Sequence, residues 1–243
     1  GDARQRMEGP PQIRELVVQM EETSIGSTVA QLLLESGAVH VSPGKPFILR
    51  SGWASPVYVD VRRLISSVAG RKVLVDAAQA VVRHRIGLQN IDAVAGAETA
   101  GVPYAAWLAD RLSLPLLIVR KKPLGFGRNA QIEGMAQAGA RVLLVDDLTT
   151  DGQSKRNFCK AVRDSGLELA HVLSIFYYDT FAESRRTMEE IGVAMHALAT
   201  WQDIIAQART GTVLTAADIE KVEGFLLHTS EWSKAHGGIS RLP

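Results

Sequence analysis

A short apolar run that leads directly into two adjacent acids constrains the fold of this chain more than any other feature. It lies in the segment RVLLVDDLTTDGQSK, residues 141–155. Val142 to Val145 has the length and content of a strand buried on both faces, and Asp146 and Asp147 follow it directly. Small residues rich in hydroxyl groups come next, and a helical pattern follows them. The segment therefore predicts a buried strand, an acid pair, a turn and the start of a helix.

Strand and helix patterns alternate along the middle of the chain. Strands are predicted at residues 93–96, 116–119, 142–145, 170–178 and 194–198, and helices at residues 101–112, 153–164 and 182–191. This alternation predicts an α/β fold with a mainly parallel sheet flanked by helices on both faces. In such folds ligands bind at the C-terminal ends of the strands.

Further elements are predicted on either side of this alternating region. Before it lie helical patterns at residues 13–22, 25–36 and 72–86, with short strands near Val39 and at residues 47–49 and 57–61. We expect the opening strands to form a small lobe over the ends of the sheet strands. After the alternating region the chain is helical again from Trp201, and Thr215 to Asp218 has the pattern of a helix start.

The turn after the acid pair suits a sugar phosphate. Free N–H groups and the dipole at a helix N-terminus favour a phosphate-sized anion, and two carboxylates suit the hydroxyls of the attached sugar. A simpler interpretation is structural, since any buried strand can end in aspartate and Asp151 could cap the following helix. Taken alone, the segment leaves both interpretations open.

Composition and charge exclude several other classes of protein. A chain of 243 residues can form one α/β domain with additions. The net charge is +1 without a long basic tract, so we expect no nucleic-acid partner. The polar opening residues lack the apolar core of a signal peptide, and we expect no membrane span. Cys159 is the only cysteine, which rules out an intrachain disulfide and fits a cytoplasmic protein.

Three further segments have residue types that suit polar or charged ligands. Residues 47–60, FILRSGWASPVYVD, predict an irregular hairpin with Arg50 before a Ser-Gly turn. Residues 96–103, GAETAGVP, predict a turn whose N–H groups can approach an anion, and residues 120–127, RKKPLGFG, form a basic loop. Singly, each also fits a structural role: a plain hairpin, an ordinary turn or a solvated run of charge.

Together and in this order, the four segments resemble a known enzyme family. The acid-pair segment resembles the 5-phosphoribosyl-1-pyrophosphate (PRPP) motif of type I phosphoribosyltransferases. The hairpin resembles the hood of orotate phosphoribosyltransferases, and residues 96–103 resemble the pyrophosphate loop of the family. The basic loop with the following QIEG resembles its mobile loop. The resemblance implies the type I phosphoribosyltransferase fold in a single domain, residues 1–243. Within it we expect N-terminal helices and hood in residues 1–65, an α/β core in 66–200, and a helical C-terminal extension in 201–243.

The resemblance also implies a reaction and an assembly. Orotate attacks C1 of PRPP and expels pyrophosphate with Mg²⁺ bound, which gives orotidine 5′-monophosphate. The acids Asp146 and Asp147 are expected to hold the metal indirectly, through ribose hydroxyls or water. The expected assembly is a homodimer in which the loop at residues 120–128 acts on the site of the neighbouring subunit.

Site residues are carried over from the resemblance. Catalytic roles are expected for Asp146, Asp147, Arg120, Lys121 and Lys122. PRPP contacts are expected from Arg50, Glu98, Thr99, Ala100, Thr149, Thr150, Asp151, Gly152, Gln153 and Ser154. Orotate contacts are expected from Ser55, Pro56, Val57, Tyr58, Val59 and Thr150.

Three positions depart from the family pattern. Leu124 and Phe126 stand where the mobile loop of the family has lysine and histidine, and Asp151 stands where a small neutral residue is usual. Two alternatives therefore stay open: a PRPP-binding regulatory protein with weak catalysis, and a type I phosphoribosyltransferase acting on another base. The hood argues against the second, because purine-type relatives place their base-binding element near the C-terminus.

Overall fold

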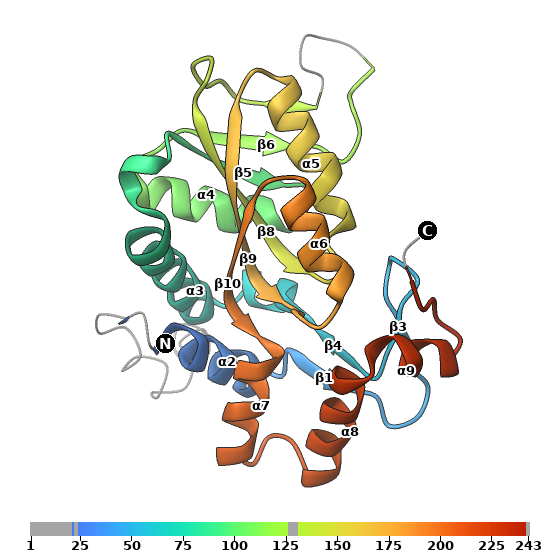
Figure 1. Cartoon of the computed structure of the whole chain (residues 1–243). Helices are drawn as coiled ribbons and strands as arrows, with labels where there is room; N and C mark the ends of the chain where they lie inside the picture. Colours follow the sequence, from blue (N-terminus) through green and yellow to red (C-terminus); the bar gives the residue numbers. More distant parts are fainter. Residues whose placement is uncertain (1–20, 22–23, 126–130, 242–243) are drawn as a thin grey trace.

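A six-stranded sheet forms the centre of the computed structural model, which describes residues 21, 24–125 and 131–241 (Figure 1). Its strand order is β10-β9-β8-β5-β6-β7, and every neighbouring pair is parallel except β6 and β7. The strands are β5 (Ala93–Ala97), β6 (Leu116–Val119), β7 (Ile132–Glu133), β8 (Arg141–Thr149), β9 (Glu168–Tyr177) and β10 (Ala194–Thr200). The α/β class with a mainly parallel sheet is confirmed.

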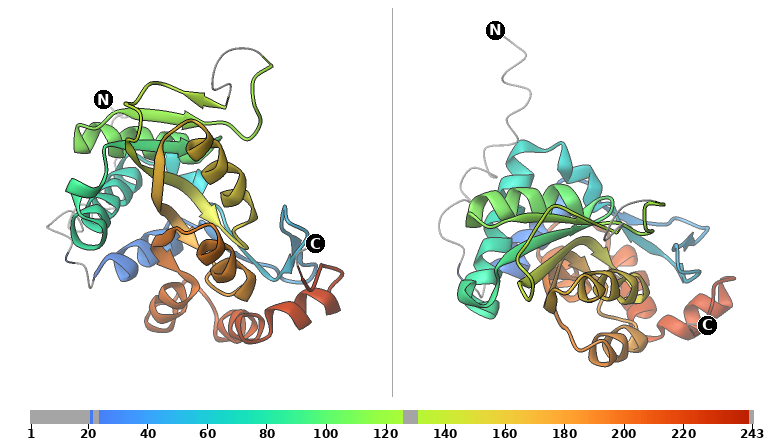
Figure 2. Two further views of the ribbon diagram at one scale, coloured as in Figure 1. Left: turned by 45° about the horizontal axis from the view of Figure 1, so that its top comes forward. Right: turned by 90° about the horizontal axis from the view of Figure 1, so that it is seen from above.

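Helices cover both faces of this sheet, as the view from above shows (Figure 2). One face carries α2 (Ile25–Glu35), α3 (Val68–Val81) and α4 (Gly101–Leu112), and the other carries α5 (Gln153–Asp164) and α6 (Ala182–Glu190). The central strand β8 supplies both cores, because alternate residues of a strand point to opposite faces. Leu143 and Val145 lie in the core with α4, whereas Val142 and Leu144 lie in the core with α5.

The opening strands form a hood of two small antiparallel ribbons beyond the sheet. In the first ribbon β1 (Val39–Val41) pairs with β4 (Val57–Val59), and in the second β2 (Phe47–Ile48) pairs with β3 (Ala54–Ser55). Below the sheet in Figure 1, the C-terminal part of the chain forms α7 (Trp201–Thr210), α8 (Ala216–Leu227) and α9 (Thr229–Ala235). The helix start predicted at Thr215 to Asp218 is confirmed, and these two residues form a capping box at the start of α8.

Helix boundaries predicted from turn residues agree well with the structure. The helices predicted at residues 101–112 and 153–164 have the bounds of α4 and α5, and the helix predicted at 25–36 is α2. The helix predicted at 13–22 falls almost entirely outside the described residues. No helix in the described ranges is long and apolar enough to cross a membrane.

Several boundaries differ from the prediction, and some short elements were not predicted. The strand predicted at 142–145 runs on to Thr149, so the acid pair lies within β8 rather than beyond it. The helix predicted at 72–86 begins at Val68, where the Ser67 side chain accepts a hydrogen bond from the Gly70 N–H, and its last turn is a π-helix over residues 82–86. A short 3-10 helix η3 (Val61–Ile65), between β4 and α3, was not predicted, because one turn has no measurable periodicity.

Candidate active site

The two acids of β8 point to opposite faces of the sheet. Asp146 follows the alternation of Val142 and Leu144 toward α5, whereas Asp147 follows Leu143 and Val145 toward α4 and the hood. Both are largely buried, with relative exposures of 6% and 8%. Each carboxylate therefore needs its own partner on its own face.

Asp146 is held by a buried lysine. The Lys155 ammonium, in the first turn of α5, is fully buried and forms a short ion pair with Asp146. The same ammonium donates to the Ser154 hydroxyl at 3.2 Å, and the other Asp146 oxygen accepts the Asp147 N–H at 2.9 Å. These bonds occupy both oxygens of Asp146, so this acid is a fixed part of the scaffold.

Asp147 is the acid that faces the hood. Its Oδ2 accepts from Nε of Arg62 in η3 at 3.2 Å, and the Arg62 side chain is largely exposed. Burial, followed by the neighbouring charge of Asp146, raises the pKa of Asp147 to about 6, and Arg62 opposes this shift. Burial and the carboxylates of Asp60 and Asp147 raise the pKa of Tyr58 as well, so this hood tyrosine lies close enough to Asp147 to be affected by its charge.

The turn after β8 leads into the N-terminus of α5. Thr149, the last residue of β8, is buried and shares a short hydrogen bond with Ser174, whereas Thr150 is half-buried. The Gln153 N–H donates to Asp151 Oδ1 at 3.0 Å, but the N-cap residue of α5 is Gly152, so Asp151 does not occupy the capping position. Asp151 is buried, and its other oxygen has no partner within the described part of the chain.

A second turn lies beside the first at the end of β5. It contains Glu98, Thr99 and Ala100, and the peptide bond between the first two is cis. Gly101 begins α4 next to β8, and a Cβ there would collide with the Val145 carbonyl and the Asp146 Cα. Glycine at this position therefore lets the turn after β5 approach the acid pair closely.

The basic loop leaves the sheet at the end of β6. The Arg120 guanidinium lies 2.5 Å from Glu133 of β7 and 3.8 Å from Glu98, and the Lys121 N–H donates to Glu98 at 2.8 Å. These contacts tie the start of the loop to the turn after β5. Lys122 is exposed and Leu124 is half-buried, whereas Phe126 lies outside the described residues.

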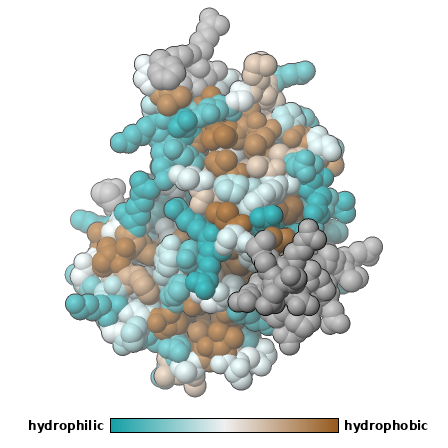
Figure 3. Space-filling model, turned by 180° about the vertical axis from the view of Figure 1, so that it is seen from behind, coloured by the Kyte–Doolittle hydropathy of each residue, from teal (hydrophilic) through white to brown (hydrophobic). Residues whose placement is uncertain are grey.

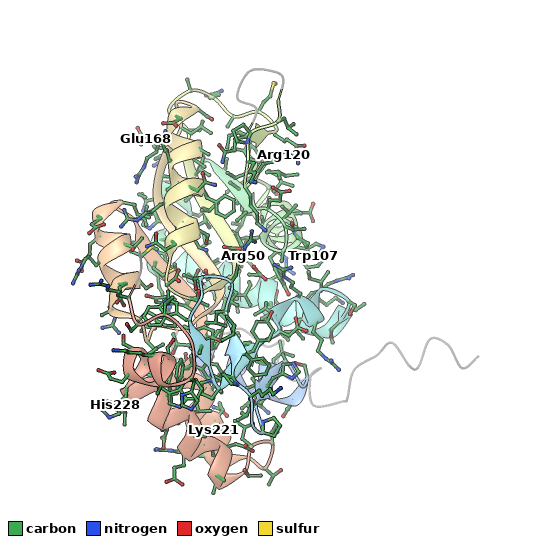
Figure 4. The ribbon with its side chains drawn as sticks, turned by 90° about the vertical axis from the view of Figure 1, so that its right-hand side faces the viewer. Arg50, Trp107, Arg120, Glu168, Lys221 and His228 are labelled. Carbon is green, nitrogen blue, oxygen red and sulfur yellow. The ribbon has the colours of Figure 1, made fainter. Side chains whose placement is uncertain are left out.

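The hood residues predicted to contact a base are partly fixed by one another. Ser55 is fully buried, and its hydroxyl donates to the Val57 carbonyl at 2.7 Å and accepts the Val57 N–H at 3.2 Å. The hydroxyl of Tyr178, directly after β9, donates to the same carbonyl at 3.0 Å. Arg50 is exposed in the hood loop, and in Figure 4 it lies between Arg120 above and the C-terminal helices below.

Two residues of the site, Lys155 and Arg62, were missed by the sequence reasoning. Lys155 lies three, four and seven residues before Phe158, Cys159 and Val162, the buried apolar side of α5. A lysine on an apolar stripe is a readable signal for a buried ion pair. Arg62 carries no such signal, because its partner lies 85 residues away along the chain.

The described ranges contain no group of three or more His, Cys, Asp or Glu side chains that could hold a metal ion. Both acids of β8 already have a cationic partner. Such a donor set fits a divalent ion that takes most of its ligands from a phosphorylated substrate and water.

Comparisons with known proteins agree on one family. No family model matches the chain. An orotate phosphoribosyltransferase of Roseobacter denitrificans is 47% identical over 207 residues, 85% of this chain and 92% of that protein. The solved orotate phosphoribosyltransferase of Aeropyrum pernix is 31% identical with a TM-score of 0.64, covering 74% of this chain and 99% of that one. UMP synthase of Leishmania donovani gives a TM-score of 0.72 at 26% identity over 84% of this chain, which spans 43% of that longer chain.

We predict that Lys155→Met lowers the stability of the fold strongly, because it leaves the Asp146 carboxylate buried without its cation. The expected loss is about 3–5 kcal/mol, or roughly 10 °C in melting temperature. Lys160→Met on the same helix is the matched control, because its pair with Asp164 is exposed. Melting curves of both variants test this, and equal melting temperatures would contradict a buried ion pair at Asp146.

We also predict a pH-dependent stability difference between the wild type and Asp147→Asn. The folded state raises the pKa of Asp147 from 3.8 to about 6, so the folded state binds more protons between these values. The contribution of Asp147 to the unfolding free energy therefore falls as the pH rises from about 4 to about 6. The unfolding free energy of Asp147→Asn, relative to that of the wild type, should therefore rise by on the order of 2 kcal/mol across this pH interval. Denaturant unfolding at each pH measures the gain. Asp164→Asn, at an exposed site, is the control: its difference in unfolding free energy from the wild type should not change with pH.

Proposed function

This chain belongs to the orotate phosphoribosyltransferase family, and we propose that it is a cytoplasmic enzyme of pyrimidine biosynthesis. It transfers the 5-phosphoribosyl group of PRPP to orotate, giving orotidine 5′-monophosphate and pyrophosphate. One observation carries the assignment of the site: the turns after β5, β6 and β8 meet at one edge of the sheet, beneath the hood. C-terminal strand edges are where α/β proteins bind their ligands.

The 5′-phosphate of PRPP is assigned to the N-terminus of α5. Gln153 and Ser154 are exposed there, next to half-buried Thr150, so the hydroxyls of Ser154 and Thr150 are available to an anion. The Gln153 N–H is already bonded to Asp151, so N–H donors must come from the other residues of this turn. Thr149 and Asp151 contribute mainly through the backbone in this proposal, because their side chains are buried and bound to Ser174 and the Gln153 N–H. The ribose then lies over the end of β8.

Asp147 is the acid assigned to the reacting sugar. C1 of the ribose becomes cation-like as the diphosphate departs, and a nearby carboxylate stabilises that charge without forming a bond to it. Asp147 faces the hood, whereas Asp146 is occupied by Lys155, so the two acids have different roles. Asp146 is a positioning residue: it fixes the Asp147 backbone through the N–H that it accepts.

The departing diphosphate is assigned to the cations around the basic loop. Arg50 in the hood and Lys122 in the loop are exposed, and Lys121 follows the anchored Arg120. Guanidinium and ammonium groups neutralise the charge that develops on the leaving group. Mg²⁺, when bound to the substrate oxygens, would supply the same neutralisation and would meet Asp147 through ribose hydroxyls or water.

Orotate is assigned to the hood at residues Ser55 to Val59. The Val57 N–H and C=O are bonded to the Ser55 and Tyr178 hydroxyls, and the Pro56 carbonyl accepts the Ser42 N–H, so the base is recognised by the groups of this ribbon that these bonds leave free. The ring of Tyr58 stacks near His40 and lies 6.0 Å from the Phe47 ring, which stiffens this ribbon. The Ser55 hydroxyl fixes the Val57 backbone in a single orientation. A preorganised backbone edge of this kind distinguishes bases by their hydrogen-bonding pattern.

Turnover of PRPP with orotate, followed as the loss of orotate absorbance, tests the proposed function. We expect Asp147→Asn to lower kcat/KM for PRPP by on the order of 10²-fold, and Asp146→Asn to lower it as well. Asp164→Asn, at an exposed site of α5, should retain wild-type kinetics. Wild-type kinetics in both Asp147→Asn and Asp146→Asn would contradict the assignment of these acids to the PRPP site. Binding of PRPP without measurable turnover in the wild type would instead favour the regulatory alternative.

We further propose that the protein is a homodimer in which the basic loop acts on the partner subunit. Apolar side chains gather on the upper part of the face seen from behind (Figure 3). On α4, Val102, Ala106 and Trp107 are only half-buried in the single chain. Incompletely buried apolar side chains of this kind support a subunit interface.

Mixing two impaired chains tests this exchange of loops. A Lys121→Ala chain and an Asp147→Asn chain, each poor alone, should regain activity when mixed. In a mixed dimer, one of the two sites receives an intact loop over an intact pocket, so up to about a quarter of wild-type activity is expected from a statistical mixture. Mixed dimers confirmed by mass that remain inactive would show that each loop acts within its own subunit.

A further inference from the structure

The C-terminal segment at residues 229–239, here called the C-terminal strap, is bonded to the hood loop that carries Arg50. The Ile239 N–H donates to the Gly52 carbonyl at 3.0 Å, and the Ala54 N–H donates to the Ser233 hydroxyl at 2.9 Å. The two segments are 179 residues apart in sequence at Ala54 and Ser233. The hood loop therefore takes its conformation partly from the far end of the described chain.

Ser233 is the centre of this contact. Its hydroxyl is fully buried, accepts the Ala54 N–H and donates to the Ile239 carbonyl at 2.6 Å. One side chain thus closes the strap on itself and binds the hood loop at the same time. Ala54 is also fully buried, so its N–H would be left without a partner if this hydroxyl were removed.

Close backbone packing reinforces these bonds. A Cβ added at Gly238 would lie against the Ala54 nitrogen and the Ser233 hydroxyl, well inside van der Waals contact. Gly52, with φ of +97°, also has the Ile239 side chain against its open face. Glycine at position 238 is therefore required for this close approach, and glycine at position 52 suits the positive φ of the hood loop.

The strap is anchored to the sheet as well as to the hood. At the start of α9 the Thr229 hydroxyl lies 2.7 Å from the hydroxyl of Thr180, in the loop that follows β9. Trp53, in the hood loop, packs on Phe181 of the same β9–α6 connection with ring centroids 4.7 Å apart. The C-terminal strap and the hood loop therefore both pack on the β9–α6 connection.

We propose that the C-terminal strap is a positioning element for substrate binding, with Ser233 and Gly238 as its positioning residues. It fixes Gly52 and Ala54, which lie between Arg50 and Ser55, the residues assigned to the diphosphate and to the base. This inference rests on the proposed function. It adds a role for α9 and the residues that follow it, which hold the hood loop in the conformation that binds orotate.

Gly238→Ala and Ser233→Ala test the proposal, with Gly224→Ala in α8 as the matched control because no atom lies within 4 Å of a Cβ there. We expect both strap variants to raise KM for orotate by about tenfold while kcat stays within about threefold, since they loosen a binding loop. The control should keep wild-type KM and kcat. Assays are run well below the melting temperature of every variant.

A merely structural role predicts a different pattern. In that case the strap variants would have a lower melting temperature and a smaller active fraction, but an unchanged KM for orotate, and the proposal would be overturned. Hydrogen exchange of residues 50–56 gives a readout without turnover: exchange should be at least about tenfold faster in Gly238→Ala than in Gly224→Ala. If the wild type consumes no orotate, the proposed function fails. In that case the hydrogen-exchange measurement alone tests whether the strap holds the hood loop. Equal exchange rates of residues 50–56 in Gly238→Ala and Gly224→Ala would overturn the proposal.

Discussion

The buried ion pair between Lys155 and Asp146 is the interaction on which the rest of the site depends. It joins the first turn of α5 to the end of β8, and it lets a charged strand residue remain inside the core. Because strand residues alternate, fixing Asp146 on the α5 face directs Asp147 to the other face. The geometry of the turn after β8 and the orientation of Asp147 thus follow from one contact. A buried pair of this kind adds little net stability compared with an apolar pair, so its value lies in placing these groups.

Much of the fold could be predicted because the chain marks its helices clearly. Gly101 marks the start of α4, and Ser165-Gly166 marks the end of α5. The apolar runs of β5, β6 and β8 are short and unambiguous. The end of β8 could not be predicted in the same way. Asp146, Asp147 and Thr149 have the composition of a turn, but pairing with β9 continues through Thr149. Hydrogen bonds from a neighbouring strand outweigh local preference there, and a single sequence does not contain that information.

The segments that form the candidate site could be predicted from the sequence, but most of the side-chain contacts between them could not. The segments that resemble phosphate and base motifs meet in space, but resemblance treated the two acids as equivalent. Arg62 and Ser233 make contacts with residues 85 and 179 positions away, and neither belongs to a periodic pattern. Long-range contacts of single polar side chains depend on how elements pack, so they become visible only in the folded molecule. Lys155 is the exception, because a lysine on the buried stripe of α5 already signals a partner.

The hairpin of β6 and β7 limits how far the basic loop can reach. Pairing of Val119 with Ile132, together with the bond from the Arg120 N–H to the Gln131 carbonyl, brings both ends of the loop to one point on the sheet edge. An extended chain spans about 3.4 Å per residue, so Lys122 is tethered within about 7 Å of Arg120. If Lys122 serves a neighbouring subunit, the diphosphate bound by that subunit must lie within this distance plus the length of one lysine side chain. For a homodimer of the proposed kind, the tether therefore limits the spacing between the two sites, and only subunit arrangements that satisfy this limit can exchange loops.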